Sequence, residues 1–225
     1  MALERVLEPE VMDTQQEAVD YNAMDHSTVN EVFVNDLLAI TGEPAPEILR
    51  DILDLGTGTA LIPVELCNKV QECRVMAVDM AAQMLDLAKY NLEINSLTDR
   101  IELAQVDAKQ MAFPDGQFDL IISNSIIHHI PDPNRCLSEA VRVTRTGGLL
   151  FFRDLMRPES SEEVSRLVQQ YAGNENAHQK QMFDDSLRAA LSLEEIREMI
   201  ATLGFEKESV TATSDRHWTW TAHKA

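Results

Sequence analysis

Residues 52–66 read ILDLGTGTALIPVEL, an apolar strand that runs through a glycine-rich turn into a helix with a proline near its start. Gly56 and Gly58 let the backbone turn sharply and approach a ligand closely, and the N-terminus of the following helix supplies amides and positive dipole. A dinucleotide-binding turn of the type G-x-G-x-x-G would have a third glycine at position 61, where Leu61 stands. The turn therefore favours a nucleoside cofactor over a pyrophosphate.

Apolar runs alternate with helical stretches on both sides of this turn, which is typical of a parallel sheet covered by helices on both faces. Five strands are predicted at 48–55, 73–78, 101–105, 118–123 and 148–152, with helices at 61–69, 81–94 and 133–144. Two closing strands, 208–213 and 217–222, flank the turn-prone Ser214 and Asp215 and predict an antiparallel hairpin. The predicted fold is α/β, a doubly wound, Rossmann-like, mostly parallel sheet of seven strands that ends in a C-terminal antiparallel hairpin.

The length of 225 residues predicts a single domain over residues 1–225. We expect an N-terminal helical lid at 1–46, with a helix at 27–40 that Gly42 and Pro44 end. A cofactor-binding core at 47–157, a helical insertion or lid at 158–192, and a C-terminal helix and hairpin at 193–225 follow. Because ligands of open α/β sheets bind beyond the carboxyl ends of the strands, both lid segments are expected to contact the substrate.

The charge balance is acidic, with 19 Lys and Arg residues against 38 Asp and Glu residues and a formal net charge of −19. Phosphates and anionic lipid surfaces would be repelled, so neither nucleic acid nor membrane is expected as a partner. No apolar run reaches the roughly 18 residues of a membrane span. The N-terminus MALERVLEPEVMD carries acids where a signal peptide is apolar. We expect a cytoplasmic protein that is a monomer or a homodimer.

The three cysteines, Cys67, Cys73 and Cys136, are too scattered for a metal knuckle or a disulfide framework. They are expected to be small buried hydrophobic residues. No metal site is predicted.

Polar residues stand at the carboxyl ends of successive predicted strands. Asp54 precedes the glycine turn, and Asp79 ends the strand in VMAVDM, where a carboxylate can accept hydrogen bonds from both ribose hydroxyls. Asp107 in QVDAKQM lies just beyond the third strand, within reach of an exocyclic adenine amine. The fourth strand, in FDLIISNSIIHHIPDP, ends at Ser123 and Asn124. Because the carboxyl ends of parallel strands lie at the same edge of a sheet, these side chains are expected to face one crevice.

These four motifs resemble class I S-adenosylmethionine-dependent methyltransferases, and within them the small-molecule branch with the methyltransferase-11 type of domain. The resemblance spans about residues 48–153, where GGLLFFRD is similar to the family's fifth strand, and the closing strands at 205–222 also fit. It implies S-adenosyl-L-methionine as cofactor and S-adenosyl-L-homocysteine as product. The third glycine of the family's G-x-G-x-G loop is replaced here by Ala60.

The resemblance also implies a cofactor site. Asp79 looks like the ribose-binding acid, Asp107 with Ala108 like the adenine-contacting pair, and Tyr21 resembles a tyrosine that some members fold over the methionine end. The expected cofactor contacts are Asp54, Gly56, Thr57, Gly58, Thr59, Asp79, Met80, Met84, Asp107, Ala108, Asn124, Ser125 and Tyr21.

The implied reaction is methyl transfer to a small-molecule acceptor by in-line displacement. Because a sulfonium methyl is already an activated electrophile, catalysis consists mainly of positioning the acceptor and excluding water. If the acceptor must lose a proton, His129 and His128 are the candidate catalytic residues, since the ordinary pKa of histidine lies near neutrality. The candidate acceptor contacts are Arg153, Asp154, His178, Met182 and Phe183.

Several alternatives stay open. Arg153 and Asp154 could instead form an internal ion pair, and the insertion could be a solvated helix with one apolar face. A nicotinamide-dependent oxidoreductase would use the same strand-end acid, but Leu61 and the lack of a Tyr-x-x-x-Lys pair count against it. A non-catalytic nucleoside-binding module is the third function. Nucleic-acid methylation is disfavoured because Ser125 and Ile126 stand where an N-P-P-Y motif would have prolines.

Overall fold

A seven-stranded sheet forms the centre of the computed structural model, which describes residues 3–24, 26–42 and 49–225. The strand order is β3-β2-β1-β4-β5-β7-β6. β1 to β5 run parallel, while β7 runs antiparallel to both β5 and β6, so the predicted doubly wound sheet with a closing hairpin is confirmed. The strands are β1 Asp51–Leu55, β2 Arg74–Asp79, β3 Ile101–Gln105, β4 Phe118–Asn124, β5 Thr144–Leu155, β6 Val210–Ala212 and β7 His217–His223.

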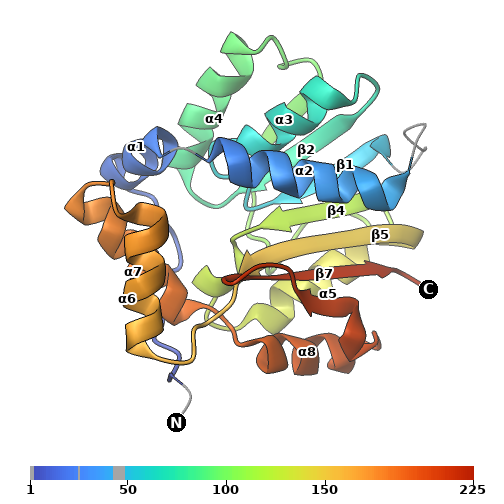
Figure 1. Ribbon diagram of the computed structural model, residues 1–225. Helices are drawn as coiled ribbons and strands as arrows, with labels where there is room; N and C mark the ends of the chain where they lie inside the picture. Colours follow the sequence, from blue (N-terminus) through green and yellow to red (C-terminus); the bar gives the residue numbers. More distant parts are fainter. Residues whose placement is uncertain (1–2, 25, 43–48) are drawn as a thin grey trace.

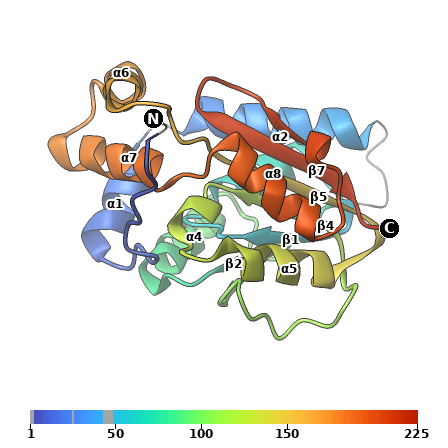
Figure 2. The same cartoon turned by 90° about the horizontal axis from the view of Figure 1, so that it is seen from below.

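Alternate residues of the central strands fill two separate cores, because successive side chains of a strand point to opposite faces of the sheet. In β5, Phe151 packs in the core under α2, α3 and α4, while Phe152 packs in the core under α5 and α8. Both faces are therefore covered (Figures 1 and 2), which explains the nearly continuous apolar runs. The helices are α2 Ser27–Thr41, α3 Leu61–Lys69, α4 Ala82–Ile94, α5 Pro133–Val143 and α8 Leu193–Thr202.

A group of three further helices lies at the end of the sheet toward which β4 points (Figure 1). They are α1 Gln15–Ala23, α6 Ser161–Ala172 and α7 Ala177–Ala189. The N-terminal segment at 3–12, here called the strap, runs along α7 (Figure 2), and its Val6 amide donates to the carbonyl of Arg188 at 3.1 Å. The strap and these helices together lie over the carboxyl ends of the parallel strands (Figure 1).

The structure differs from the sequence prediction mainly at element ends. α1 was not predicted, although Thr14 and Glu17 form a capping box that marks its start. β5 is longer than 148–152 because Thr144 pairs with Phe118 of β4 before a register shift, after which pairing resumes at Leu149 and continues to Arg153. β6 is shorter than 208–213, since Lys207–Ser209 forms a 3₁₀ turn. The predicted strand start at Ile48 and helix stop at Pro44 lie outside the described residues.

All three cysteines are buried, as expected, and the sulfurs of Cys67 and Cys73 lie 3.1 Å apart. Among the described residues, no helix has both the length and the apolar character needed to cross a membrane.

Candidate functional site

The strand order reverses between β1 and β4, and the crevice beyond such a reversal is where open α/β sheets bind ligands. A cleft lies there, and we call it the glycine-loop cleft. Its volume is about 760 Å³ when the open solvent at its mouth is included. Ten of the thirteen predicted cofactor contacts line it: Tyr21, Gly56, Gly58, Asp79, Met80, Met84, Asp107, Ala108, Asn124 and Ser125. The other three, Asp54, Thr57 and Thr59, are buried and are not among its lining residues.

The loop after β1 is held in a conformation that suits glycine. Gly56 and Gly58 have φ of +69° and +54°, and the amides of Gly56 and Thr57 both donate to the carbonyl of Val78 at 2.9 Å. A Cβ on Gly56 would lie within 2.7 to 2.9 Å of the Ile126 side chain. Ala60, which replaces the third family glycine, also takes a left-handed φ of +61°, so the turn keeps the glycine geometry with an alanine.

Asp79 ties the end of β2 to the glycine loop. One carboxylate oxygen accepts from the Gly58 amide at 2.8 Å, and the other accepts from the Ala81 amide at 2.9 Å. Burial raises the pKa of Asp79 even though these amides favour the ionised form. Burial likewise raises the pKa of Asp54 to about 7, and burial together with these two acids raises the pKa of Tyr21 to about 12.

The far end of the cleft offers further polar groups. Asp107 accepts from the Lys109 amide at 2.9 Å and pairs with the Lys109 ammonium at 2.8 Å, which lowers the pKa of Asp107 against the opposing effect of burial. Asn124 Oδ1 is buried with no hydrogen-bond partner among the described residues. A buried oxygen without a partner is costly, so this one fits the polar edge of a bound ligand. Together with the glycine loop, whose backbone a ligand can approach closely, the Asn124 oxygen makes the cleft suitable for a nucleoside.

A second, larger cavity lies under α1, α6 and α7, and we call it the lid cavity. Its volume is about 1290 Å³ when the open solvent at its mouth is included. Met182 and Phe183 of the predicted acceptor contacts line it, together with Met12, Met24, Val29 and Leu155. Its polar lining includes Thr28, Asn30, Gln179 and Ser186. Met12, Tyr21, Asn124, Ser125 and His129 line both cavities, so the two spaces adjoin at these residues.

The histidines after β4 lie on a 3₁₀ turn, Ile127–His129, beside this junction. His128 is buried, and its Nδ1 lies 2.5 Å from Asp154 Oδ1. Burial disfavours the imidazolium, but the Asp154 charge raises the pKa of His128 overall, and His128 in turn holds the pKa of Asp154 below its usual value despite burial. Burial and the neighbouring His128 lower the pKa of His129.

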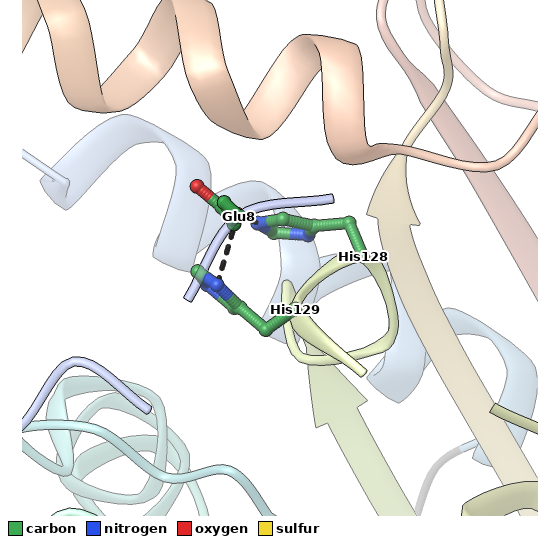
Figure 3. A group of neighbouring side chains, drawn as sticks. All are labelled: Glu8, His128 and His129. Atoms are coloured by element: carbon green, nitrogen blue, oxygen red, sulfur yellow. Dashed lines mark ion pairs between the residues drawn. The ribbon is translucent and has the colours of Figure 1, made fainter. Parts of the chain in front are cut away.

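Glu8 of the strap lies over both imidazoles (Figure 3). Its Oε1 is 2.9 Å from His129 Nδ1 and 3.6 Å from His128 Nε2. Burial opposes ionisation of this carboxyl, but the two histidines and a hydrogen bond from Ser186 lower the pKa of Glu8. The strap was expected only as part of a lid, and Glu8 carries no signal in the sequence that would link it to His128 and His129.

Three predicted acceptor contacts pair with other side chains of the protein and are not among the residues that line the lid cavity. Arg153 pairs with Asp36 of α2 at 2.6 Å and donates to Thr219 Oγ1 at 2.9 Å. Asp154 binds His128, so the two neighbours form internal ion pairs with other partners and not with each other. His178 pairs with Asp20 of α1 at 2.6 Å, which links α7 to α1.

Residues 53–152 match the family described as "Methyltransferase domain". The chain is 28% identical over 110 residues to a demethylmenaquinone methyltransferase of Bacteroides fragilis, covering 49% of this chain and 45% of the relative. It is 34% identical over 97 residues to a phosphatidylethanolamine N-methyltransferase of Cereibacter sphaeroides, covering 43% and 46%. The chain thus spans about half the length of the curated relatives it matches.

The fold is shared with a solved structure described as a putative S-adenosyl-L-methionine-dependent methyltransferase from Methanococcus maripaludis, with a TM-score of 0.74 and 17% identity over 98% of this chain and 97% of the other. The sheet, the glycine-loop cleft and these matches identify a class I methyltransferase domain. The cofactor of this class is S-adenosylmethionine. The fold class and the family resemblance of the sequence are therefore confirmed.

Acid should destabilise the protein through His217, a 9% exposed residue of β7 that lines the lid cavity. Burial and the charges of Arg216 and Arg153 lower the pKa of His217 from 6.5 to about 4. The unfolded chain therefore binds one more proton between these values, so stability falls as pH falls from about 6.5 to 4, by about 2 to 3 kcal/mol.

Urea unfolding across this pH range tests the expectation. The variant His217→Gln should show a correspondingly flatter pH dependence, whereas His223→Gln, which changes an exposed histidine of the same strand, should follow the wild type. Equal pH dependence in the wild type and His217→Gln would contradict the assignment.

Proposed function

We propose that this protein transfers the methyl group of S-adenosylmethionine to a small-molecule acceptor by in-line displacement. The cofactor occupies the glycine-loop cleft, and the acceptor occupies the lid cavity. The observation that carries the proposal is the junction of the two spaces at Tyr21, Asn124, Ser125 and His129. An acceptor atom at this junction meets the sulfonium methyl while the strap and α7 exclude water, which is the positioning that this reaction needs.

The residues of the cleft divide into three proposed roles. Asp79 holds the ribose, Asp107 with Ala108 contacts the adenine, and the loop from Gly56 to Thr59 carries the methionine portion. Asp54, Thr57 and Thr59 act from beneath the loop by supporting its shape. Tyr21 covers the methionine end, because its ring lies 3.6 Å from the position that a Cβ on Gly58 would take.

The acceptor is proposed to be largely apolar with a small polar part. Met24, Val29, Met182 and Phe183 supply an apolar lining, while Gln179 and Ser186 offer single polar groups. Such a lining suits a ligand whose orientation depends on a few hydrogen bonds. The two relatives above are named for a demethylmenaquinone and for phosphatidylethanolamine, so their names support no single acceptor, and the argument rests on the cavity.

Two other functions make different predictions at the same cleft. A nicotinamide-dependent oxidoreductase would bind NAD in place of the sulfonium nucleoside. A non-catalytic nucleoside-binding module would bind the cofactor without an adjoining acceptor space, and the lid cavity favours catalysis over this alternative.

Calorimetric titration with S-adenosylmethionine, S-adenosylhomocysteine and NAD separates these functions. We expect saturable binding of the two sulfur nucleosides and no response to NAD. Binding of NAD alone would support the oxidoreductase, and a folded protein that binds none of the three would contradict the proposed cofactor site.

Replacing Asp79 with alanine should weaken S-adenosylmethionine binding by about 1.5 to 3 kcal/mol, or roughly 10- to 150-fold, because charge-assisted hydrogen bonds to the ribose are lost. The substitution also frees the amides of Gly58 and Ala81 that the carboxylate now accepts from. Asp86→Ala, on the exposed side of α4, is the matched control and should bind the cofactor like the wild type. Unchanged affinity in a folded Asp79→Ala variant would refute the ribose contact.

A further inference from the structure

We propose that Glu8, His128 and His129 form a binding site for a divalent transition-metal ion, with zinc as the ion that fits best, and that its open coordination position faces the lid cavity. One carboxylate and two imidazoles are a ligand set found in catalytic zinc sites, which keep a position for water or substrate. The same set suits Fe²⁺ and Co²⁺, whereas Mg²⁺ and Ca²⁺ prefer oxygen ligands alone.

The distances between the ligand atoms fit this assignment. Bonds of about 2.0 to 2.1 Å at tetrahedral angles place neighbouring ligand atoms about 3.3 Å apart, and octahedral angles place them about 2.9 Å apart. Glu8 Oε1 lies 2.9 Å from His129 Nδ1 and 3.6 Å from His128 Nε2, and all three ligand atoms lie within 4.8 Å of one another. In Figure 3 both imidazoles reach the Glu8 carboxylate from the same turn.

The surrounding groups already orient the ligand atoms. Asp154 Oδ1 lies 2.5 Å from His128 Nδ1, so Nδ1 carries the proton and the lone pair of a neutral ring belongs to Nε2, which faces Glu8. A carboxylate behind a metal-binding histidine is the usual support of such sites. Ser186 Oγ donates to the Glu8 carboxylate at 3.2 Å. His129 Nδ1 is buried and has no hydrogen bond of good geometry among the described residues, despite its contact with Glu8.

The backbone also brings the strap to this position. The Arg5 guanidinium donates to the carbonyls of His128 and Ile130 at 3.2 and 3.1 Å and to that of Ala189 at 2.7 Å. These bonds join the strap to the histidine turn and to α7, three residues before Glu8. The third ligand is therefore held in place by a segment that contacts both neighbouring elements.

The position of the metal site indicates which acceptors a bound ion would favour. His128 and His129 both line the lid cavity, and His129 also lines the glycine-loop cleft. An ion bound here lies beside the junction of the two cavities, and it favours acceptors with a hydroxyl, thiol or carboxylate group that can occupy the open position. This consequence for the acceptor rests on the proposed function, but the binding of the metal does not.

Calorimetric titration of the metal-free full chain with ZnCl₂ tests the site without any methyl transfer. We expect one tight zinc ion per chain, and a weakening of at least about 10-fold in Glu8→Gln and in His129→Ala. His223→Ala removes an exposed histidine of β7 and is the matched control, which should bind zinc like the wild type. MgCl₂ should give only the weak binding expected of a chain with a net charge of −19.

The visible spectrum of the Co²⁺-loaded wild type gives a second readout that does not depend on a variant folding correctly. Imidazole coordination at a site of low coordination number gives d–d absorption that surface carboxylates do not, and excess zinc should remove it. A wild type that binds no stoichiometric zinc, equal zinc affinity in all variants, or a Co²⁺ spectrum of a hydrated ion only would each overturn the proposal. Each of these outcomes would leave binding of S-adenosylmethionine, and with it the proposed function, to be judged by its own titration.

Discussion

Replacing Asp154 with alanine should reduce the free energy of unfolding by about 3 to 5 kcal/mol, as measured by urea unfolding at pH 7. The side chain is only 1% exposed, and it accepts three hydrogen bonds in the interior. They come from the amides of Ile127 and Leu155 at 2.5 and 2.6 Å and from His128 Nδ1 at 2.5 Å. Alanine would leave all three donors buried without an acceptor, next to a histidine whose pKa this carboxylate raises.

Two further variants separate this effect from a general loss of charge. Glu163→Ala breaks an exposed ion pair with Arg166 on α6 and should leave the stability nearly unchanged. Asp154→Asn keeps the size of the side chain but turns one acceptor into a donor facing other donors, so we expect an intermediate loss. A loss below about 1 kcal/mol for Asp154→Ala would mean that these interior bonds do not hold the histidine turn.

Replacing Gly56 with alanine should destabilise the protein by about 2 to 5 kcal/mol and prevent cofactor binding. The left-handed φ of +69° costs an alanine about 1 to 2 kcal/mol. The added methyl would also lie 2.7 to 2.9 Å from three carbons of the Ile126 side chain, and such overpacking costs about 1 to 3 kcal/mol. The backbone strain and the steric overlap both arise in the wall of the glycine-loop cleft, which Gly56 and Ile126 line. If the loop or Ile126 moves to relieve the overlap, the shape of the cleft changes.

Gly204→Ala is the matched control, because Gly204 has a φ of +88° but a Cβ there would have no neighbour within 4 Å. It should show the backbone cost alone, with normal binding of S-adenosylmethionine. The double variant Gly56→Ala, Ile126→Ala should recover part of the stability that Gly56→Ala loses through contact. If Gly56→Ala and Gly204→Ala lose the same stability in urea, the contact with Ile126 carries no cost and the argument from overpacking is wrong.

Local sequence patterns determined the core of this protein. Apolar runs with the right lengths predicted the parallel strands, and the Gly56 and Gly58 turn predicted the cleft at the carboxyl edge. These predictions succeed because strand burial, a left-handed turn and a strand-end acid are each decided by residues within one short segment. The position of Asp79 beside the glycine loop then follows from topology, since the carboxyl ends of neighbouring parallel strands meet at one edge.

Partner choice around the lid was not predictable in this way. The sequence left open whether Arg153 and Asp154 contact the acceptor or form an internal ion pair, and it did not indicate the partners that the structure gives them, Asp36 and His128. An apolar pattern tells which face of a segment is buried, but it does not tell which of several acids a buried cation will meet. That choice depends on how whole elements pack against each other, and no spacing in the sequence records it.

The sequence by itself therefore determined the doubly wound sheet, the glycine loop and the acids at the strand ends, because each depends on interactions within a segment or on the order of strands. Only the tertiary structure decided that the strap crosses the histidine turn, that Glu8 lies over His128 and His129, and that the two cavities adjoin there. The physical reason is that these contacts join segments far apart in the chain, and the packing of the strap and α7, with Arg5 donating to carbonyls of both neighbours, fixes their position.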